Sequence, residues 1–166
     1  MSDIGTIHTI KGELPQALEY YRKALALRES LSAADPKDAR VRYALGTAYE
    51  RIGDVLQEMG QTSAALKHFR KTLENREELV RTDPANNNNQ VALADAYERF
   101  GYLYASLAKS KGRRELWTDA KSWYEKSLAA FQALAARGAL HGADAEGPAR
   151  IKKNLAECDA ALGRAR

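Results

Sequence analysis

The stretch SLSAADPKDARVRYALGTAYERIGDVL, residues 30–56, has a second copy in ELVRTDPANNNNQVALADAYERFGYLY, residues 78–104. Three separate motifs recur with one common offset of 48 in residue number: the Asp-Pro pair at 35–36 and 83–84, the Ala-Tyr-Glu-Arg tetrad at 48–51 and 96–99, and a glycine at 53 and 101. Chance matches do not share a register, so the constant offset indicates an internal repeat.

A second pattern repeats with the same period in the other halves of the repeats. GELPQALEYYRKAL begins at Gly12 and GQTSAALKHFRKTL begins at Gly60, with the same offset, while LWTDAKSWYEKSL is a later copy. Each copy places an aromatic residue four positions after an alanine, in the pairs Ala17/Tyr21, Ala65/Phe69 and Ala120/Tyr124. This spacing puts both residues on one helix face, where the alanine admits a neighbouring helix and the aromatic ring fills the space beside it.

The composition predicts an all-α chain. Helix-forming residues predominate, Pro occurs only four times, and no segment alternates as a half-buried strand would. We expect helices over residues 2–10, 14–34, 38–59, 62–82, 88–109, 115–137 and 148–163. The run Asn86–Asn89 aligns with residues 38–41, so it is expected to form a turn and a helix N-cap rather than an open linker.

These motifs resemble the tetratricopeptide repeat, whose signature is W-x2-L-G-x2-Y, then A-x3-F, then Pro. The first part is matched by Tyr49, Ile52, Gly53 and Leu56, by Tyr97, Phe100, Gly101 and Tyr104, and in degenerate form by Met1, Ile4, Gly5 and His8; Pro36 and Pro84 match the last. The resemblance implies a right-handed α-solenoid of antiparallel helix pairs with a C-terminal capping helix. The period of 48 exceeds the usual 34, so longer helices are expected, as in arrays of bacterial multidomain proteins, including kinase tails.

The repeats predict one domain over residues 1–166. It would contain helix pairs at 1–35, 36–83 and 84–138 and a capping helix at 148–163. The first helix is expected to be short, because only about ten residues precede Gly12, which would leave apolar surface on the second helix uncovered. Either the chain is a piece of a longer array, or a second copy covers that surface as a homodimer.

Charge and cysteine content favour a cytoplasmic protein. The net charge is +4 with acids and bases interspersed, no secretory signal or membrane-length apolar run is present, and the single Cys158 excludes an internal disulfide. No phosphate-binding, metal-binding or nucleophile motif occurs, so we expect no enzyme activity, no cofactor and no metal site. His8 and Cys158 are expected in the core, and Trp117 and Trp123 are expected to pack helices together.

The family resemblance implies that the first helix of each pair lines a concave groove that receives a protein or peptide. The corresponding residues are Thr47, Glu50, Arg51, Asp54 and Gln57 in one repeat, and Asp95, Glu98, Arg99, Tyr102 and Ala105 in the next. Four of these residues are acidic, namely Glu50, Asp54, Asp95 and Glu98, which favours a partner with basic residues over a carboxylate ligand. The alternative is that the Glu-Arg neighbours at 50–51 and 98–99 are solvated or paired with each other.

Two other functions stay open from the sequence. A seven-residue insertion contains a basic loop at 109–114, with Lys109, Lys111, Arg113 and Arg114, which could neutralise nucleic-acid phosphates. No aromatic residues are interleaved with these cations to stack on bases. The chain could also be a spacer or dimerisation arm of a larger enzyme, such as a kinase.

Overall fold

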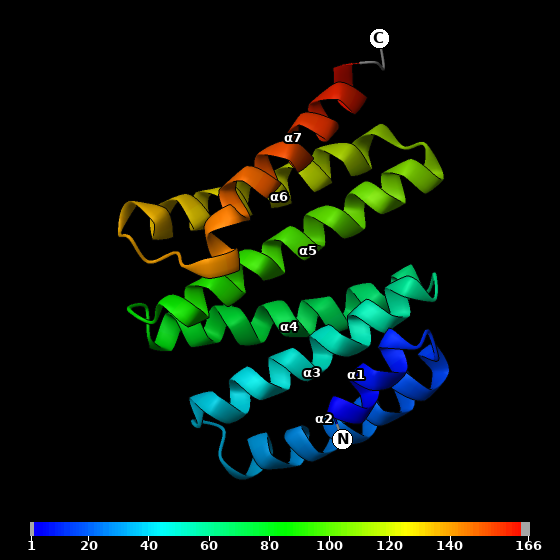
Figure 1. Ribbon diagram of the computed structural model, residues 1–166, viewed down its shortest axis with the longest axis vertical. Helices are drawn as coiled ribbons and strands as arrows, with labels where there is room; N and C mark the ends of the chain where they lie inside the picture. The colour runs from blue at the N-terminus through cyan, green and yellow to red at the C-terminus, as the bar shows by residue number, and fades with distance from the viewer. Residues whose placement is uncertain (1, 164–166) are drawn as a thin grey trace. The chain divides into compact units, whose positions relative to one another are not determined.

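The computed structural model describes residues 2–163, and this part of the chain is all α-helical apart from one short 3-10 helix and its turns (Figure 1). The elements are α1 (Ser2–Ile10), α2 (Leu14–Ala34), α3 (Ala39–Glu58), α4 (Thr62–Thr82), α5 (Asn87–Lys111), α6 (Arg114–Ala136), η1 (Gly142–Glu146) and α7 (Gly147–Gly163). The expected all-α class is confirmed, and every expected helix is found. Among the described residues, no helix is both long and apolar enough to cross a membrane.

Contacts along the chain divide it into two compact units, with the boundary after Leu79. The first unit holds α1, α2, α3 and most of α4, and the second holds the end of α4, α5, α6, η1 and α7. In the first unit α1 packs on α2 and α2 on α3, and in the second α5 packs on α6 and α6 on α7. The single domain over residues 1–166 stays a prediction.

Two helices begin with the same kind of cap, at equivalent positions of the repeat. The Asp38 side chain accepts hydrogen bonds from the backbone N–H groups of Arg40 (2.8 Å) and Val41 (3.3 Å) at the start of α3. The Asn86 side chain accepts from the N–H of Asn89 (3.2 Å) at the start of α5. Both caps satisfy N–H groups that have no partner inside the helix. The asparagine run is therefore a turn and a cap, as expected.

Glycine against an aromatic ring is the contact that joins the helices of each repeat. A Cβ atom at Gly53 would lie 2.5 Å from the Phe69 ring, and one at Gly101 would lie 2.5 Å from the Tyr124 ring. Carbon atoms approach no closer than about 3.5 Å without repulsion, so only glycine permits these contacts. The degenerate first copy obeys the same rule, because a Cβ at Gly5 would lie 2.7 Å from Tyr21.

A buried interhelical hydrogen bond also repeats in both units. The Thr72 hydroxyl of α4 donates to the carbonyl of Gly46 in α3 at 3.2 Å, and the Ser127 hydroxyl of α6 donates to the carbonyl of Ala94 in α5 at 2.8 Å. Both hydroxyls are buried, where an unpaired polar group would be costly. The bonds therefore add specificity to the apolar contact made by the glycines.

The basic segment at 109–114 was expected to form a loop, and this prediction is wrong. The α5 helix continues through Lys111 and α6 begins at Arg114, so only residues 112–113 connect them. Gly112 ends α5 in the left-handed conformation, with φ of 61°. The seven inserted residues lengthen the two helices, to 25 and 23 residues, because seven residues make about two helical turns that propagate without breaking hydrogen bonds.

The α7 helix closes the second unit as the expected capping helix. Its buried residues Ile151 and Cys158 join a core with Tyr124, Phe131 and Leu134 of α6. The opposite face of α7 is polar and exposed, with Lys152, Lys153, Glu157 and Asp159. A polar outer face is what the end of a helical repeat requires.

The two tryptophans pack within the second unit, as expected. Trp123 stacks on Phe100 with ring centroids 4.6 Å apart and lies 5.9 Å from Tyr97. Trp117 is partly buried against the core of this unit. Both rings therefore hold α5 and α6 together.

Replacing Gly53 by Ala is expected to destabilise the first unit. The added methyl group must displace the Phe69 ring, which costs about 1–3 kcal/mol, more than the roughly 1 kcal/mol that alanine gains over glycine in a helix. Chemical denaturation followed by circular dichroism measures the effect. Gly163→Ala is the matched control, because a Cβ there meets nothing within 4 Å. Equal midpoints for the two variants would contradict the role given to Gly53.

Candidate interaction surfaces

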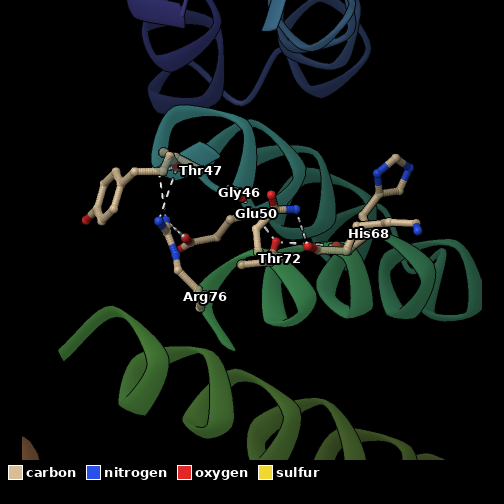
Figure 2. Close-up of polar contacts among 9 residues, drawn as sticks. Gly46, Thr47, Glu50, His68, Thr72 and Arg76 are labelled. Carbon is tan, nitrogen blue, oxygen red and sulfur yellow. Dashed lines mark hydrogen bonds and ion pairs between the residues drawn. The ribbon is translucent and has the colours of Figure 1, made fainter. Parts of the chain in front are cut away.

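Arg76 is a buried cation in the first unit, with a side chain only 2% exposed. It extends from α4 to α3, where its guanidinium donates to the carbonyl of Tyr43 (3.1 Å) and the hydroxyl of Thr47 (2.8 Å). The same group lies 4.0 Å from the centre of the Tyr43 ring. Figure 2 shows the guanidinium pointing toward Thr47 and Glu50. Thr47, an expected groove residue, is therefore part of an internal hydrogen-bond network.

Glu50 completes this arrangement, with its carboxylate 3.6 Å from the Arg76 guanidinium. The Glu50 side chain keeps 23% of its surface exposed, whereas the Arg76 Nε is buried without a hydrogen-bond partner among the described residues. A buried charge is tolerated only when paired, and removing one partner leaves the other uncompensated. Arg76 thus fixes the position of the Glu50 carboxylate. Its positive charge also offsets the negative charge for which the sequence favoured a basic ligand.

A pocket of about 160 Å³ lies between α1, α2 and α3 in the first unit. It is much smaller than the roughly 300–1,000 Å³ of a typical small-molecule site, so it has room for a single side chain. Two expected site residues, Thr47 and Arg51, lie in its wall. The complete lining is Asp3, Thr6, Tyr21, Ala24, Arg28, Thr47, Ala48 and Arg51.

On α5, the two expected acids share one arginine from the capping helix. Arg150 of α7 donates to both carboxylate oxygens of Glu98, at 2.8 and 2.7 Å, and lies 3.6 Å from Asp95. The hydrogen bond to Glu98 raises the pKa of Arg150 above its usual value. Bidentate pairs of this kind, with two parallel hydrogen bonds between arginine and a carboxylate, are among the strongest side-chain ion pairs. Asp95 and Glu98 are therefore brought together, but by an internal partner.

The other expected site residues differ in exposure. Arg51 and Tyr102 are exposed, the latter at 61%, while Asp54, Gln57 and Arg99 are half-buried. Ala105 is only 4% exposed, so its expected place on a binding face is wrong. It packs with the core of the second unit, since a small apolar side chain there lets helices approach. The α3 residues belong to the first unit and the α5 residues to the second.

The basic segment 109–114 is partly neutralised by carboxylates. The Lys109 ammonium lies 2.7 Å from Glu157 of α7, and the Arg113 guanidinium lies 3.6 Å from Glu115. Phosphate binding needs several cations available on one surface. At least two of the four cations are engaged here, which weakens the case for a nucleic-acid site.

Within residues 2–163, no group of three His, Cys, Asp or Glu side chains is placed to hold a metal ion. His8, expected in the core, is only partly buried. Its ring stacks on Tyr20 with centroids 5.2 Å apart, and its Nδ1 lies 2.5 Å from Glu13. The carboxylate keeps the imidazole at the surface, because a polar ring with such a partner gains little from entering the core.

Cys158 is buried, as expected. Burial is the main cause that raises the pKa of its thiol to about 11, and the carboxylates of Glu157 and Asp159 contribute. Since the thiolate is the reactive form, a raised pKa makes a thiol inert near neutral pH. Cys158 therefore packs as a small apolar side chain.

Two models of the tetratricopeptide repeat match the chain, over residues 1–55 and 45–84, and together they span half of its 166 residues. The glycine–aromatic contacts of the structure lie at the corresponding signature positions. The chain belongs to the tetratricopeptide repeat family. Such repeats generally mediate protein–protein interactions.

A solved structure has the same fold. The crystal structure of BtubC (BKLC) from P. vanneervenii superposes with a TM-score of 0.71 at 18% identity, covering 98% of this chain and 55% of that one. The chain thus spans about half the length of that protein, and the similarity shows the all-α tetratricopeptide solenoid fold alone. A crystal structure of MamA covers 99% of both chains at 17% identity, but its TM-score of 0.28 supports no conclusion. A search of curated proteins finds no match.

Two arginines that organise the tetratricopeptide surfaces were missed by sequence reasoning. Arg76 had a signal, because Arg28 occupies the same position in the preceding repeat. An arginine recurring at a position that should face a neighbouring helix indicates a buried charge with a partner. Arg150 had no such signal, since it follows the irregular connection at residues 137–146, where the repeat register is lost.

Arg76→Ala is expected to destabilise the first unit by about 2–4 kcal/mol, because it opens a cavity and removes the buried hydrogen bonds to Tyr43 and Thr47 together with the ion pair to Glu50. The midpoint of urea unfolding measures the loss. Arg70→Ala is the matched control, since Arg70 lies on the same helix and is exposed, and such substitutions stay within about 0.5 kcal/mol. A loss as small as that of the control would refute the structural role of Arg76.

The Cys158 thiol is expected to resist a thiol reagent at pH 8 in the folded protein and to react promptly in urea. Folding raises the pKa of the Cys158 thiol from 9.0 to about 11. The neutral thiol therefore contributes its full share to the free energy of unfolding below pH 9, and this contribution is lost as the pH rises through 11. Between these values, the stability of Cys158→Ala should fall less steeply than that of the unmodified chain. Rapid labelling of the native thiol would contradict the assignment.

Proposed function

We propose that the protein is a non-catalytic tetratricopeptide scaffold that binds a peptide segment of a partner protein over the inner face of α3. The pocket between α1, α2 and α3 is the observation that carries this proposal. It lies beside the expected residues Thr47 and Arg51 and has the size of one side chain. A bound peptide would insert a single anchoring residue there, as hot-spot residues commonly do.

The charges around the pocket define the anchoring residue. Asp3 offers a carboxylate, while Arg28 and Arg51 offer guanidinium groups, and Tyr21 and Ala24 form an apolar wall. This lining suits a side chain with an apolar stem and a polar tip. With two guanidinium groups and one carboxylate the lining is net positive, so it favours an acidic or neutral polar tip over the basic one expected from the sequence.

For the second unit we propose a separate contact set on α5. Tyr102 is the most exposed of its expected binding residues, and tyrosine is enriched where proteins make their strongest contacts. Arg99 lies one helical turn away on the same helix. In this proposal Asp95 and Glu98 bind a cation of the partner only if that cation displaces Arg150, which pairs with both carboxylates.

The proposal includes no cofactor and no chemistry, since neither the sequence motifs nor the described side chains suggest any. It places the protein in the cytoplasm, on the grounds that the chain carries a single cysteine and therefore no internal disulfide framework. A second copy of the chain is a further proposed partner, through the surface of α1 and α2. A role as a spacer arm of a larger enzyme is compatible with the same binding surface.

Nucleic-acid binding is the runner-up, because Lys111 is exposed and Arg114 begins α6 beside it. Fluorescence anisotropy with random-sequence RNA, measured over a range of salt, tests it. Counterion release would make a true affinity fall steeply with salt. We expect no saturable binding. An RNA affinity that falls steeply with salt, and that is lost in Lys111→Glu, would instead favour nucleic-acid binding over peptide binding.

Arg51→Glu and Tyr102→Ser are expected to lower the recovery of the partner about tenfold each, which corresponds to roughly 1.4 kcal/mol per contact. The measurement is affinity capture from a lysate of the source organism, quantified by mass spectrometry. Lys152→Glu is the matched control, because it reverses an exposed charge on the outer face of α7. If both variants recover every partner that the unmodified chain recovers, binding over these faces is wrong.

A further inference from the structure

Arg150 of α7 lies where a cation of a partner would have to lie on α5. Its guanidinium donates to both carboxylate oxygens of Glu98, at 2.8 and 2.7 Å, and lies 3.6 Å from Asp95. Both carboxylates were expected from the sequence to face a basic ligand. The basic group that the structure places against them comes from the chain itself.

The arrangement around Arg150 suits a guanidinium group. Two parallel hydrogen bonds to one carboxylate need the planar fork of an arginine, which the ammonium group of a lysine does not have. The hydrogen bond to Glu98 is the main cause that raises the pKa of Arg150, and the charges of nearby carboxylates contribute, including Asp144 of η1. The carboxylates of α5 and η1 therefore form a surface that selects arginine.

The ion pair is exposed enough to exchange its arginine. The Arg150 side chain keeps 46% of its surface, and Asp95 keeps 43%. Ion pairs this exposed contribute little to stability, because water replaces their contacts readily. An incoming guanidinium can therefore take the place of Arg150 while the Arg150 side chain turns into solvent, and no buried charge is left without a partner.

The simplest alternative role for Arg150 is to fasten α7 to the second unit, but α7 has other attachments. Ile151 and Cys158 are buried in the core of this unit. Glu157 lies 2.7 Å from Lys109 of α5, and Asp159 lies 2.6 Å from Lys121 of α6. The docking of α7 thus rests on contacts along its whole length, and Arg150 can leave its site while α7 stays in place.

We propose that Arg150 is an internal competitor, which occupies a site on α5 for an arginine of the partner protein and is displaced when the partner binds. This inference rests on the proposed function of the α5 face and adds the chemistry of the partner residue and a means of excluding weak ligands. Every cationic ligand must first displace Arg150, which lowers its apparent affinity. A segment that also contacts Tyr102, one helical turn after Glu98, gains the additional energy that displacement needs.

Fluorescence anisotropy of labelled hexaarginine and hexalysine peptides with the full chain tests this proposal. Arg150→Gln removes the competitor and should tighten hexaarginine binding about tenfold, the effect of one charge-assisted contact. Hexalysine should gain less, because an ammonium group cannot make the bidentate contact. Adding Glu98→Gln to Arg150→Gln should abolish the gain. Circular dichroism should show the same helix content in all variants, since the pair lies at the surface.

Lys109→Gln is the matched control. It removes the same charge and also breaks an ion pair between α5 and α7, but at Glu157. Lys109 lies about 16 Å from Glu98 along α5, beyond the Debye length of about 8 Å at physiological salt, so its variant should leave the hexaarginine affinity within about twofold. An equal gain in Lys109→Gln and Arg150→Gln, a gain that survives Glu98→Gln, or no gain in Arg150→Gln would overturn the proposal.

The peptide measurement and the capture experiment fail independently. If Arg51→Glu and Tyr102→Ser recover every partner while Arg150→Gln shows the Glu98-dependent gain, the proposed binding faces are wrong and the arginine site is supported. If both variants lose the partner but Arg150→Gln shows no gain, the proposed function is supported and Arg150 is not a competitor.

Discussion

A bare glycine facing an aromatic ring is the contact on which the helix pairs depend. Gly5 meets Tyr21, Gly53 meets Phe69 and Gly101 meets Tyr124, and in each case a Cβ atom would overlap the ring. The missing side chain lets the ring rest on helix backbone, which sets how deeply two helices approach. That depth brings a buried hydroxyl within hydrogen-bond distance of the facing carbonyl in both units. Apolar packing and polar specificity therefore follow from one steric constraint.

Charged side chains then decide which parts of the surface remain for partners. Glu50 and Glu98 lie where a ligand-binding face is expected, but each is held by an arginine from another helix, Arg76 or Arg150. A carboxylate already paired in this way binds a new cation only by exchange, so it contributes little to affinity. The proposed binding surface therefore rests on the small pocket beside Arg51 and on exposed residues such as Tyr102.

Much of this architecture was predictable, and the exceptions have physical causes. The repeat register located the helices, the Asn86 cap and the glycine and aromatic positions of the signature, because these depend on local spacing. The insertion was misjudged as a loop, since good helix formers extend the flanking helices at little cost. The burial of Ala105 and the partners of Glu50 were not foreseen, because they depend on which neighbouring helix covers each face.

The sequence by itself determined the periodicity, the helix boundaries outside the insertion, and the family, because each rests on residue types at fixed short separations. Only the tertiary structure decided which charges are paired between helices, where a pocket remains and which apolar side chains stay exposed. Helical spacing states which residues share a face. It does not state what lies opposite that face, and the energy of a charge or an apolar side chain depends on that neighbour.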